Sequence, residues 1–386
     1  MNDILQLTII LVASLIATLL SRRLKIPAVV GQMLIGILLA PSILGWIHGG
    51  HVIEVMSEIG VILLMFLAGL ESDLTVLKKN FKASMLVAIG GVAVPLIVFA
   101  LVAAGLGYGF STSFFYGIVF AATSVSITVE VLQEYGKLST RAGSIILGAA
   151  VVDDILAVLV LSIFTSFKNG GSGTQLLFQF LLEILFFVFL FVVHKLIPKL
   201  WKFVEKLPIA VKNTTVALII CLGLSLLADS VGMSAVIGSF FAGLAISQTE
   251  VSHKIEEYTS AIGYVIFIPV FFVSIALSVQ FDSLIHHPWI IILFTILAIL
   301  TKFLPAYFVG KSSQLTTNES LLIGTGMISR GEMALIVAQI GLASSIVTDE
   351  VYSELVIVII LATLIAPFLI KLVLKRNESK NSTANR

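Results

Sequence analysis

Two adjacent aspartates, Asp153 and Asp154, lie at the centre of the apolar stretch 142–164, which is long enough to cross a membrane as a helix. An ionisable group at that depth costs at least about 2.5 kcal/mol, so each one needs a partner, a water-filled cavity or a task. Adjacent residues on a helix point about 100° apart, so the two carboxylates cannot both face one partner. One can therefore hold a fixed cation while the other faces a cavity.

The basic residue best placed to be that fixed cation is Lys302. It lies in the apolar stretch 288–309, a few residues from its centre and at a depth similar to that of the aspartates. One lysine and one aspartate would satisfy a purely structural ion pair, and the second carboxylate would remain as an excess negative charge. A mobile cation or a proton could neutralise that charge, so the sequence favours ion transport over a structural ion pair.

Two further apolar stretches contain polar residues near their centres. Arg330 and Glu332 lie among glycines that favour an interrupted helix, and they could pair with each other or with the open ends of that helix. The motif AATSVSIT places Thr123 and Ser124 where their hydroxyls could bond freed backbone groups or coordinate a cation. Support of unwound backbone is the first role that we assign to both motifs, and cation ligation by the hydroxyls is the second.

The elements that must position these groups are membrane helices. Of 386 residues, 58% are hydrophobic and 12% charged, and the mean hydropathy is +1.11, which is far from the balance of a soluble domain. We therefore expect an all-α polytopic membrane protein, with a transport domain over 1–376 and a disordered cytoplasmic tail over 377–386. The thirteen predicted transmembrane helices are 4–20, 27–45, 52–70, 83–107, 113–132, 142–164, 175–197, 209–229, 232–249, 259–280, 288–309, 320–343 and 351–374.

Lysine and arginine are distributed unevenly between alternate loops. With the amino terminus outside, 20 of the 23 basic residues fall on the cytoplasmic side, Lys168 alone lies outside, and the other two are Lys302 and Arg330. Positive charge stays in the cytoplasm during insertion, so this split supports both the orientation and the number of helices. We expect a multi-pass plasma-membrane protein with a cytoplasmic carboxyl terminus.

The two stretches with a predicted break are the fifth and the twelfth, seven helices apart. Because seven is an odd number, the two motifs cross the bilayer in opposite directions. Helices 4–6 and 11–13 would then form inverted units, each with a broken middle helix. This arrangement is typical of secondary transporters whose ion site lies near the midplane, between the repeats.

Other chemistries are less favoured. Cys221 is the only cysteine, so no cysteine metal site is available within the chain, and the six histidines lie near helix ends; we therefore assign no metal cofactor and no other cofactor. Aspartic proteolysis needs two carboxylates that share a proton, which side chains 100° apart do poorly. An enzyme is therefore the least favoured class, and no nucleic-acid partner is expected.

Several motifs together resemble the monovalent cation:proton antiporter-2 family, and within it the NapA-like sodium/proton antiporters. They span nearly the full length and read KIPAVVGQMLIGILLAPSILG, GVILLMFLAGLE, FAATSVSITVEVLQEYGKLST, GAAVVDDILAVLVL, LTKFLPAYFVG and GMISRGEMALIVAQIG. The resemblance implies a homodimer in which a core bundle, about 83–164 and 288–374, moves against a dimerisation bundle, about 4–70 and 175–280.

The resemblance also implies a role for each candidate residue. Asp154 would be the principal carboxylate for Na⁺, and Asp153 would pair with Lys302. The residues that line the unwound crossings would be Thr123 and Ser124 in the fifth helix and Arg330 and Glu332 in the twelfth.

These observations predict a secondary active antiporter that exchanges Na⁺ or Li⁺ for protons electrogenically, in salt tolerance or pH homeostasis. Potassium-efflux relatives typically carry a glutamine in place of the first aspartate and a cytosolic nucleotide-binding domain, and this chain has neither, so potassium/proton exchange is the less favoured alternative. A sodium-coupled symporter of organic anions is another alternative, although Lys302 and Arg330 both have acidic candidates nearby.

Two acidic residues, Glu130 and Glu134, lie at the predicted cytoplasmic end of the fifth helix. They could raise the local cation concentration in an inner funnel. They could also form an ordinary solvated helix end, which is the commoner situation.

Overall fold

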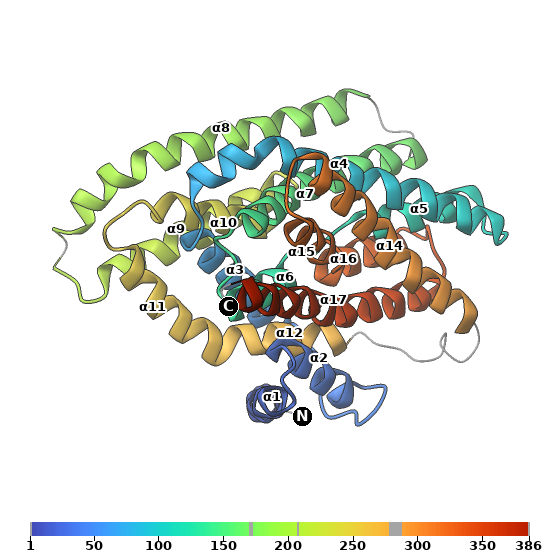
Figure 1. Ribbon diagram of the computed structural model, residues 1–386, viewed down its shortest axis with the longest axis horizontal. Coiled ribbons are helices and arrows are strands. Elements are labelled where there is room, and N and C mark those ends of the chain that lie inside the picture. The colour runs from blue at the N-terminus through green and yellow to red at the C-terminus, as the bar shows by residue number, and fades with distance from the viewer. Residues whose placement is uncertain (1, 170–172, 207, 278–287, 385–386) are drawn as a thin grey trace.

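The computed structural model describes residues 2–169, 173–206, 208–277 and 288–384, and these ranges contain helices and no strand (Figure 1). The prediction of an all-α fold is confirmed. Within the described ranges, eleven helical segments are long and apolar enough to cross a membrane, and two shorter apolar helices occupy the predicted second and ninth positions. Residues 278–280 of the predicted tenth helix and residues 385–386 of the tail lie outside the described residues.

In chain order the helices are α1 (Asp3–Leu24), α2 (Ala28–Leu39), α3 (His51–Leu70), α4 (Leu74–Gly105), α5 (Phe110–Ala121), α6 (Ser126–Glu134), α7 (Arg141–Asn169), α8 (Gly173–Val204), α9 (Lys212–Ser230), α10 (Ala235–Ile246), α11 (Ser252–Ile262), the π-helical turn η1 (Gly263–Phe267), α12 (Ile268–Leu277), α14 (Pro288–Ser312), α15 (Thr317–Gly326), α16 (Gly331–Ala343) and α17 (Asp349–Ala384).

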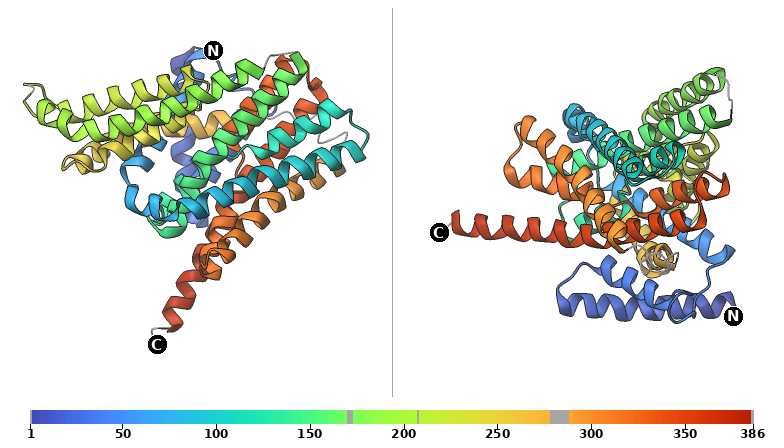
Figure 2. Two further views of the ribbon diagram at one scale, coloured as in Figure 1. Left: turned by 90° about the horizontal axis from the view of Figure 1, so that it is seen from above. Right: turned by 90° about the vertical axis from the view of Figure 1, so that its right-hand side faces the viewer.

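Several helices are longer than the hydropathy predicts, and α4 and α17 are two of them. α4 begins at Leu74 rather than at residue 83, because the Asp73 carboxylate accepts a hydrogen bond of 2.7 Å from the Thr75 amide and caps the helix before its lysine-rich first turns. α17 continues to Ala384, over most of the segment expected to be a disordered tail, and projects beyond the other helices (Figure 2). Extension of an established helix costs far less than its nucleation, so a polar sequence can continue it.

The helices other than α8, which packs mainly against α10, form two groups. One, which we call the core bundle, contains α4 to α7 and α14 to α17, and its most extensive contacts are those of α4 with α5, α7 and α14. The other, the scaffold bundle, contains α1 to α3 and α9 to α12, and its most extensive contacts are those of α10 with α3 and α9. The contacts between the two groups are fewer, and several of them involve α6, the second half of the fifth predicted helix.

An inverted repeat is visible in the packing of the scaffold bundle. A Cβ atom on Gly36 would overlap the carbonyl of Val273, and one on Gly243 would overlap the carbonyl of Phe66. The same offset of 207 residues relates Gly36 to Gly243 and Phe66 to Val273, so the two contacts are copies of one another. The repeat thus extends beyond helices 4–6 and 11–13 to the second, third, ninth and tenth helices.

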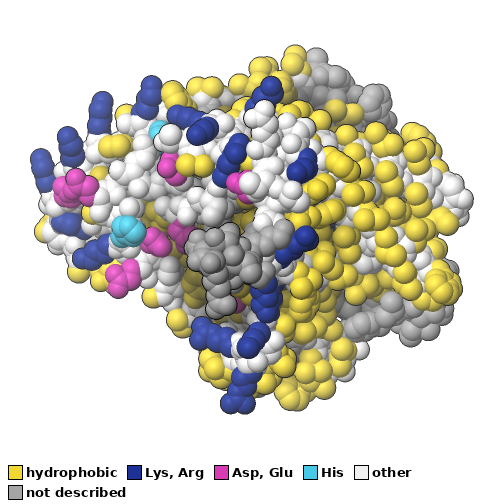
Figure 3. Space-filling view, in the orientation of Figure 1, with side chains coloured by type: hydrophobic (Ala, Val, Ile, Leu, Met, Phe, Trp, Pro, Cys, Tyr) yellow, Lys and Arg dark blue, Asp and Glu magenta, His cyan; other side chains and the backbone are white. Residues whose placement is uncertain are grey.

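Charge is distributed unevenly over the surface. Basic side chains gather over the left half of the view in Figure 3, and the right half is mainly apolar. This pattern fits the alternation of basic and neutral loops along the chain. Which side faces the cytoplasm stays a prediction.

The close helix contacts predict a clear effect on stability. Gly243→Ala should lower the free energy of unfolding by about 1–3 kcal/mol, because the added methyl group has no space beside the α3 backbone. Gly223→Ala on α9 is the matched control, since nothing lies within 4 Å of its added Cβ. Thermal unfolding of the purified variants in detergent would measure both. Equal midpoints for the two variants would contradict the close packing of α3 and α10.

Candidate ion-binding site

Two helices are interrupted in the core bundle, where the sequence predicts the breaks. Residues 122–125 separate α5 from α6, and residues 327–330 separate α15 from α16. The two unwound segments contact each other, because the Ser124 amide donates a 3.0 Å hydrogen bond to the Ser329 carbonyl. Gly331 begins α16 at φ +45°, and a Cβ there would overlap the Ser124 hydroxyl, so only glycine fits.

Lys302 and Asp153 form a buried ion pair. The lysine Nζ lies 3.0 Å from both carboxylate oxygens of Asp153, and both side chains have no exposed surface. Nζ also donates a 2.7 Å hydrogen bond to the carbonyl of Ala121, the last residue of α5. The lysine thus stabilises a carboxylate and the open end of an interrupted helix together.

Asp154 lies elsewhere on α7, toward the scaffold bundle. It lines a cavity of about 10 Å³ with Met65 of α3 and Phe240 of α10, and that volume is about what one water molecule needs. Its side chain is 6% exposed and has no hydrogen-bond partner among the described residues. The charges of Asp153, Glu332 and Lys302 act on it electrostatically. Asp154 is therefore the carboxylate of the pair whose charge no direct contact compensates.

Arg330 supports the broken helices through backbone contacts. Its guanidinium donates to the carbonyl of Ala122, at 3.3 Å, and to the carbonyl of Ala298, at 2.6 Å. The side chain is fully buried. A cation at the carboxyl end of α5 is favoured by the helix dipole as well as by these bonds. Of the two alternatives that the sequence leaves open, pairing with the open end of the helix is the one observed for Arg330.

Glu332 lies in the first turn of α16 and accepts hydrogen bonds from the opposite crossing. The Ser124 hydroxyl donates to it at 2.6 Å and the Ser126 hydroxyl at 3.0 Å. Glu332 therefore interacts with hydroxyls and does not form an ion pair with Arg330. The hydroxyl of Thr123 is buried and has no hydrogen-bond partner in the described part of the chain, so its oxygen remains available to a ligand.

A large cavity reaches the crossing from one side of the molecule. It has a volume of about 910 Å³ and extends from the loop around His48 to Glu332 at the crossing. Val158, which lies one helical turn from Asp154 on α7, lines its inner part. Glu54, Glu58 and Asp229 also line this cavity, which gives it an acidic wall.

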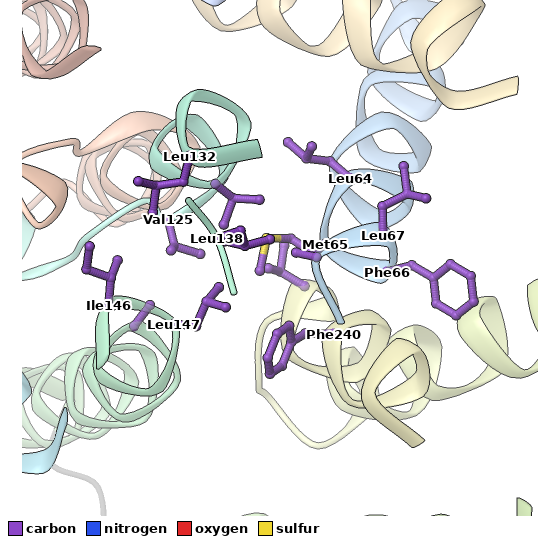
Figure 4. Close-up of a cluster of buried hydrophobic side chains, with 14 of the residues drawn as sticks. Leu64, Met65, Phe66, Leu67, Val125, Leu132, Leu138, Ile146, Leu147 and Phe240 are labelled. Carbon is purple, nitrogen blue, oxygen red and sulfur yellow. The ribbon is translucent and has the colours of Figure 1, made fainter. Parts of the chain in front are cut away.

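The opposite side of Asp154 is closed by apolar side chains. Leu64 and Met65 of α3 face Val125 and Leu147 of the core bundle, with Phe240 of α10 beside them (Figure 4). The Asp154 cavity lies within this contact. In this conformation, the 910 Å³ cavity reaches the crossing from one side, and these described apolar side chains lie between Asp154 and the other side.

Glu130 and Glu134 lie beyond this apolar contact, at the end of α6. Glu130 is only 9% exposed and accepts a hydrogen bond of 3.1 Å from the Tyr264 hydroxyl. Glu134 is exposed and accepts a 3.1 Å hydrogen bond from the Ala28 amide at the start of α2. The two carboxylates therefore contact the scaffold bundle, and their role in an inner funnel stays a prediction.

Sequence reasoning missed one buried carboxylate of the core bundle, Glu354 on α17. It accepts hydrogen bonds from the hydroxyls of Tyr116, at 2.6 Å, and Tyr108, at 3.0 Å. Burial raises the pKa of Tyr108 to about 12, so this hydroxyl keeps its proton and donates it in the hydrogen bond. Glu354 falls near the end of a predicted helix, where a charge is ordinary, so its position alone gives no signal.

The buried ion pair predicts a double-mutant result. Lys302→Met alone should destabilise the protein by about 3–5 kcal/mol, because it leaves Asp153 buried and charged without its counter-ion. Lys302→Met combined with Asp153→Asn should recover most of that loss. Thermal unfolding of wild type, both single variants and the double variant gives the coupling. A double variant no more stable than Lys302→Met would show that the two side chains do not depend on each other.

The sequence of this chain is similar to those of known membrane transporters. The family described as "Sodium/hydrogen exchanger, transmembrane" matches residues 10–376. The chain is 48% identical over 373 residues to a Na⁺/H⁺ antiporter of Enterococcus hirae, with 96% of this chain and 97% of that protein covered. It is 38% identical over 367 residues to the Na⁺/H⁺-K⁺ antiporter GerN of Bacillus cereus, with 95% of each covered.

The fold is also similar to that of a solved structure. The sodium proton antiporter MjNhaP1 from Methanocaldococcus jannaschii matches with a TM-score of 0.68 at 16% identity, over 96% of this chain and 97% of that one. At this identity the match supports the fold alone. The family match and the two close relatives cover nearly the whole chain, and the protein belongs to the sodium/hydrogen exchanger family.

Proposed function

We propose that the protein is a secondary active antiporter that exchanges Na⁺ or Li⁺ for protons across the plasma membrane. The charge balance of the site carries the proposal. In the part of the chain that the structure describes, three carboxylates, those of Asp153, Asp154 and Glu332, lie near two basic groups, Lys302 and Arg330. When all five are ionised, one negative charge is in excess, and one monovalent cation or one proton neutralises it.

Asp154 is the group at which the two ions compete. Its carboxylate lacks a hydrogen-bond partner among the described residues and borders a space of about one water molecule. A hard cation binds through oxygen and needs the carboxylate charged, whereas a proton removes that charge. The hydroxyl oxygen of Thr123 in the crossing has no hydrogen-bond partner among the described residues and can serve as a further ligand of the cation. The hydroxyl of Ser124 is another candidate.

Lys302 couples proton movement to this competition. A lysine with no exposed surface loses its proton more readily than an exposed one, and the charged carboxylate of Asp153 favours the protonated lysine when the site is empty. Entry of Na⁺ at Asp154 places a second positive charge close to Lys302 and favours release of its proton. Two protons for each sodium ion would make the exchange electrogenic.

Alternating access supplies the route. The 910 Å³ cavity reaches the crossing from the side that the charge count places outside, and apolar side chains close the other side. Movement of the core bundle against the scaffold bundle would close the outer side of Asp154 and open its inner side. We also propose that the protein forms a homodimer through the scaffold bundle. Its amino terminus lies outside and its carboxyl terminus in the cytoplasm.

Potassium/proton exchange is the second candidate. The relative GerN, named as a Na⁺/H⁺-K⁺ antiporter, is 38% identical to this chain, so potassium belongs among the ions to be tested. Symport of an organic anion has less support, because Arg330 is fully buried and bonded to two carbonyl groups. A substrate carboxylate would need a basic group that it can reach.

The central test is proton movement driven by sodium in proteoliposomes that contain the purified protein. Wild type should move protons in a way that saturates with Na⁺ or Li⁺ and depends on the membrane potential. Asp154→Asn should reduce this flux to the level of liposomes without protein, while Asp229→Asn, in the acidic wall of the outer cavity, should retain most of it. No proton movement by wild type with Na⁺, Li⁺ or K⁺ would refute the antiporter function.

The competition also predicts the pH dependence. As the pH falls below the pKa of the competing carboxylate, the apparent affinity for Na⁺ should weaken by about tenfold for each pH unit and each competing proton. The maximal rate at saturating Na⁺ should change much less. The concentration of Na⁺ for half-maximal flux, measured in steps of 0.5 pH units, tests this. A half-maximal concentration independent of pH would mean that the two ions do not share one site.

A second variant tests the coupling role of Lys302. Lys302→Ala should leave sodium-dependent exchange measurable but remove its response to the membrane potential, because one of the two coupled protons is lost. Sodium-dependent proton flux measured with and without an imposed membrane potential distinguishes electroneutral from electrogenic exchange. Exchange that keeps its full response to the potential would exclude Lys302 as a proton carrier.

A further inference from the structure

We infer that a cluster of hydrogen bonds at the end of α6 is a latch that holds the core bundle against the scaffold bundle and sets how often the inner side opens. The cluster consists of Glu130, Gln133 and Glu134 on α6, with Tyr264, Glu71 and the Ala28 amide on the scaffold. The inference rests on the proposed exchange by alternating access and adds the residues that control it.

Each contact of the cluster joins the two bundles. Tyr264 donates its hydroxyl to Glu130 at 3.1 Å and approaches the amide oxygen of Gln133 at 3.3 Å. Gln133 in turn donates from its amide nitrogen to Glu71, at 2.8 Å. If the core bundle moves to open the inner side, α6 must leave all these partners. The cluster therefore contributes to the energy difference between the two access states.

Glu134 provides the remaining contact of the latch. α2 begins after Pro27, which offers no side-chain cap, and the carboxylate of Glu134 accepts the hydrogen bond of the Ala28 amide instead. A carboxylate at a helix amino terminus is stabilised by the helix dipole as well as by the bond. α6 thus caps a helix of the other bundle, and the cap exists only while the inner side is closed.

The scaffold half of the latch is held in place. Tyr264 belongs to the π-helical turn η1, and Gly60 of α3 lets the backbone of this turn approach so closely that a Cβ would overlap the Phe267 carbonyl. Burial raises the pKa of Glu71, and the neighbouring Glu256 raises it further, whereas the hydrogen bond from Gln133 lowers it. Loss of Gln133 would leave this half-buried carboxylate without that bond.

The repeat offers an internal comparison, because the described residues of the outer side form no matching cluster. The offset of 207 residues places Ser57 at the position of Tyr264, and Ser57 bonds to Ser274 of its own bundle at 2.6 Å. The two broken helices are aligned by placing Ser124 at the position of Ser329, an offset of 205 residues. In that alignment, Leu335 occupies the position of Glu130 and Ala338 that of Gln133. Leu335 lines the open outer cavity. The side with the cluster is closed and the side without it is open.

Thiol labelling tests the latch directly in the full-length protein. Cys221 is buried and would be replaced by alanine, and a single reporter cysteine placed at Ile336, in the outer cavity, or at Leu147, behind the apolar contact. A membrane-impermeant maleimide then reports access from each side, in right-side-out and inverted membrane vesicles. The reporters need no transport activity.

Two latch variants have matched controls. Tyr264→Phe removes only the hydroxyl, and Tyr258→Phe does the same at an exposed position on α11. Glu134→Ala removes the cap of α2, and Glu257→Ala removes an exposed carboxylate of α11. Each latch variant should change the ratio of inner to outer labelling at least about fivefold in favour of the inner side, which is the effect of losing one ordinary hydrogen bond. The controls should match wild type.

The outcomes separate the latch from the proposed function. Wild type that exchanges Na⁺ for protons while both latch variants label like their controls would overturn the latch alone. A shifted labelling ratio in a protein without any cation-driven proton flux would support the latch and overturn the antiporter function. Equal unfolding midpoints for Tyr264→Phe and Tyr258→Phe would show that the shift arises from the equilibrium between folded states.

Discussion

The site depends on how the protein satisfies backbone groups that two interrupted helices leave inside the membrane. Each such group costs several kcal/mol if it has no partner in hydrocarbon. The carbonyl of Ala121 is bonded to Lys302, and that of Ala122 to Arg330. The amide of Gly331 donates to the hydroxyl of Thr363 at 3.0 Å. The basic residues of the site therefore donate hydrogen bonds to backbone carbonyl groups, in addition to balancing the charge of the carboxylates.

This use of the basic residues fixes the charge balance. Because Arg330 is held by two carbonyl groups and Glu332 by two serine hydroxyls, neither is free to turn toward Asp154. Lys302 can reach only one of two side chains that point about 100° apart, and it contacts Asp153. The excess charge therefore stays on one carboxylate, on the side of α7 that faces the scaffold bundle.

The sequence was sufficient for whatever depends on local composition and spacing. Hydropathy located the helices, the glycines and hydroxyls located both breaks, and the helical angle indicated that the two aspartates face different surroundings, whereas the family resemblance predicted which of them pairs with Lys302. Partners far apart in the chain could not be read in this way. Nothing in the spacing of Arg330 selects the carbonyl of Ala298 over the carboxylate of Glu332, and nothing near Tyr264 indicates Glu130. Such choices are made by the packing of helices, which a single sequence does not display.

The inverted repeat also has a consequence for the energies of the two access states. If the two halves were identical, the inward-open and outward-open conformations would have equal energy, and each would be equally populated. Tyr264 and Ser57 occupy matching positions in the two halves and make different hydrogen bonds, so under the proposed latch the preference for one state depends on a few hydrogen bonds. With an energy difference of this size the minor state remains populated, and a change in the bound ion can reverse which state is favoured. A much stronger inner contact would hold the ion site on one side and prevent exchange.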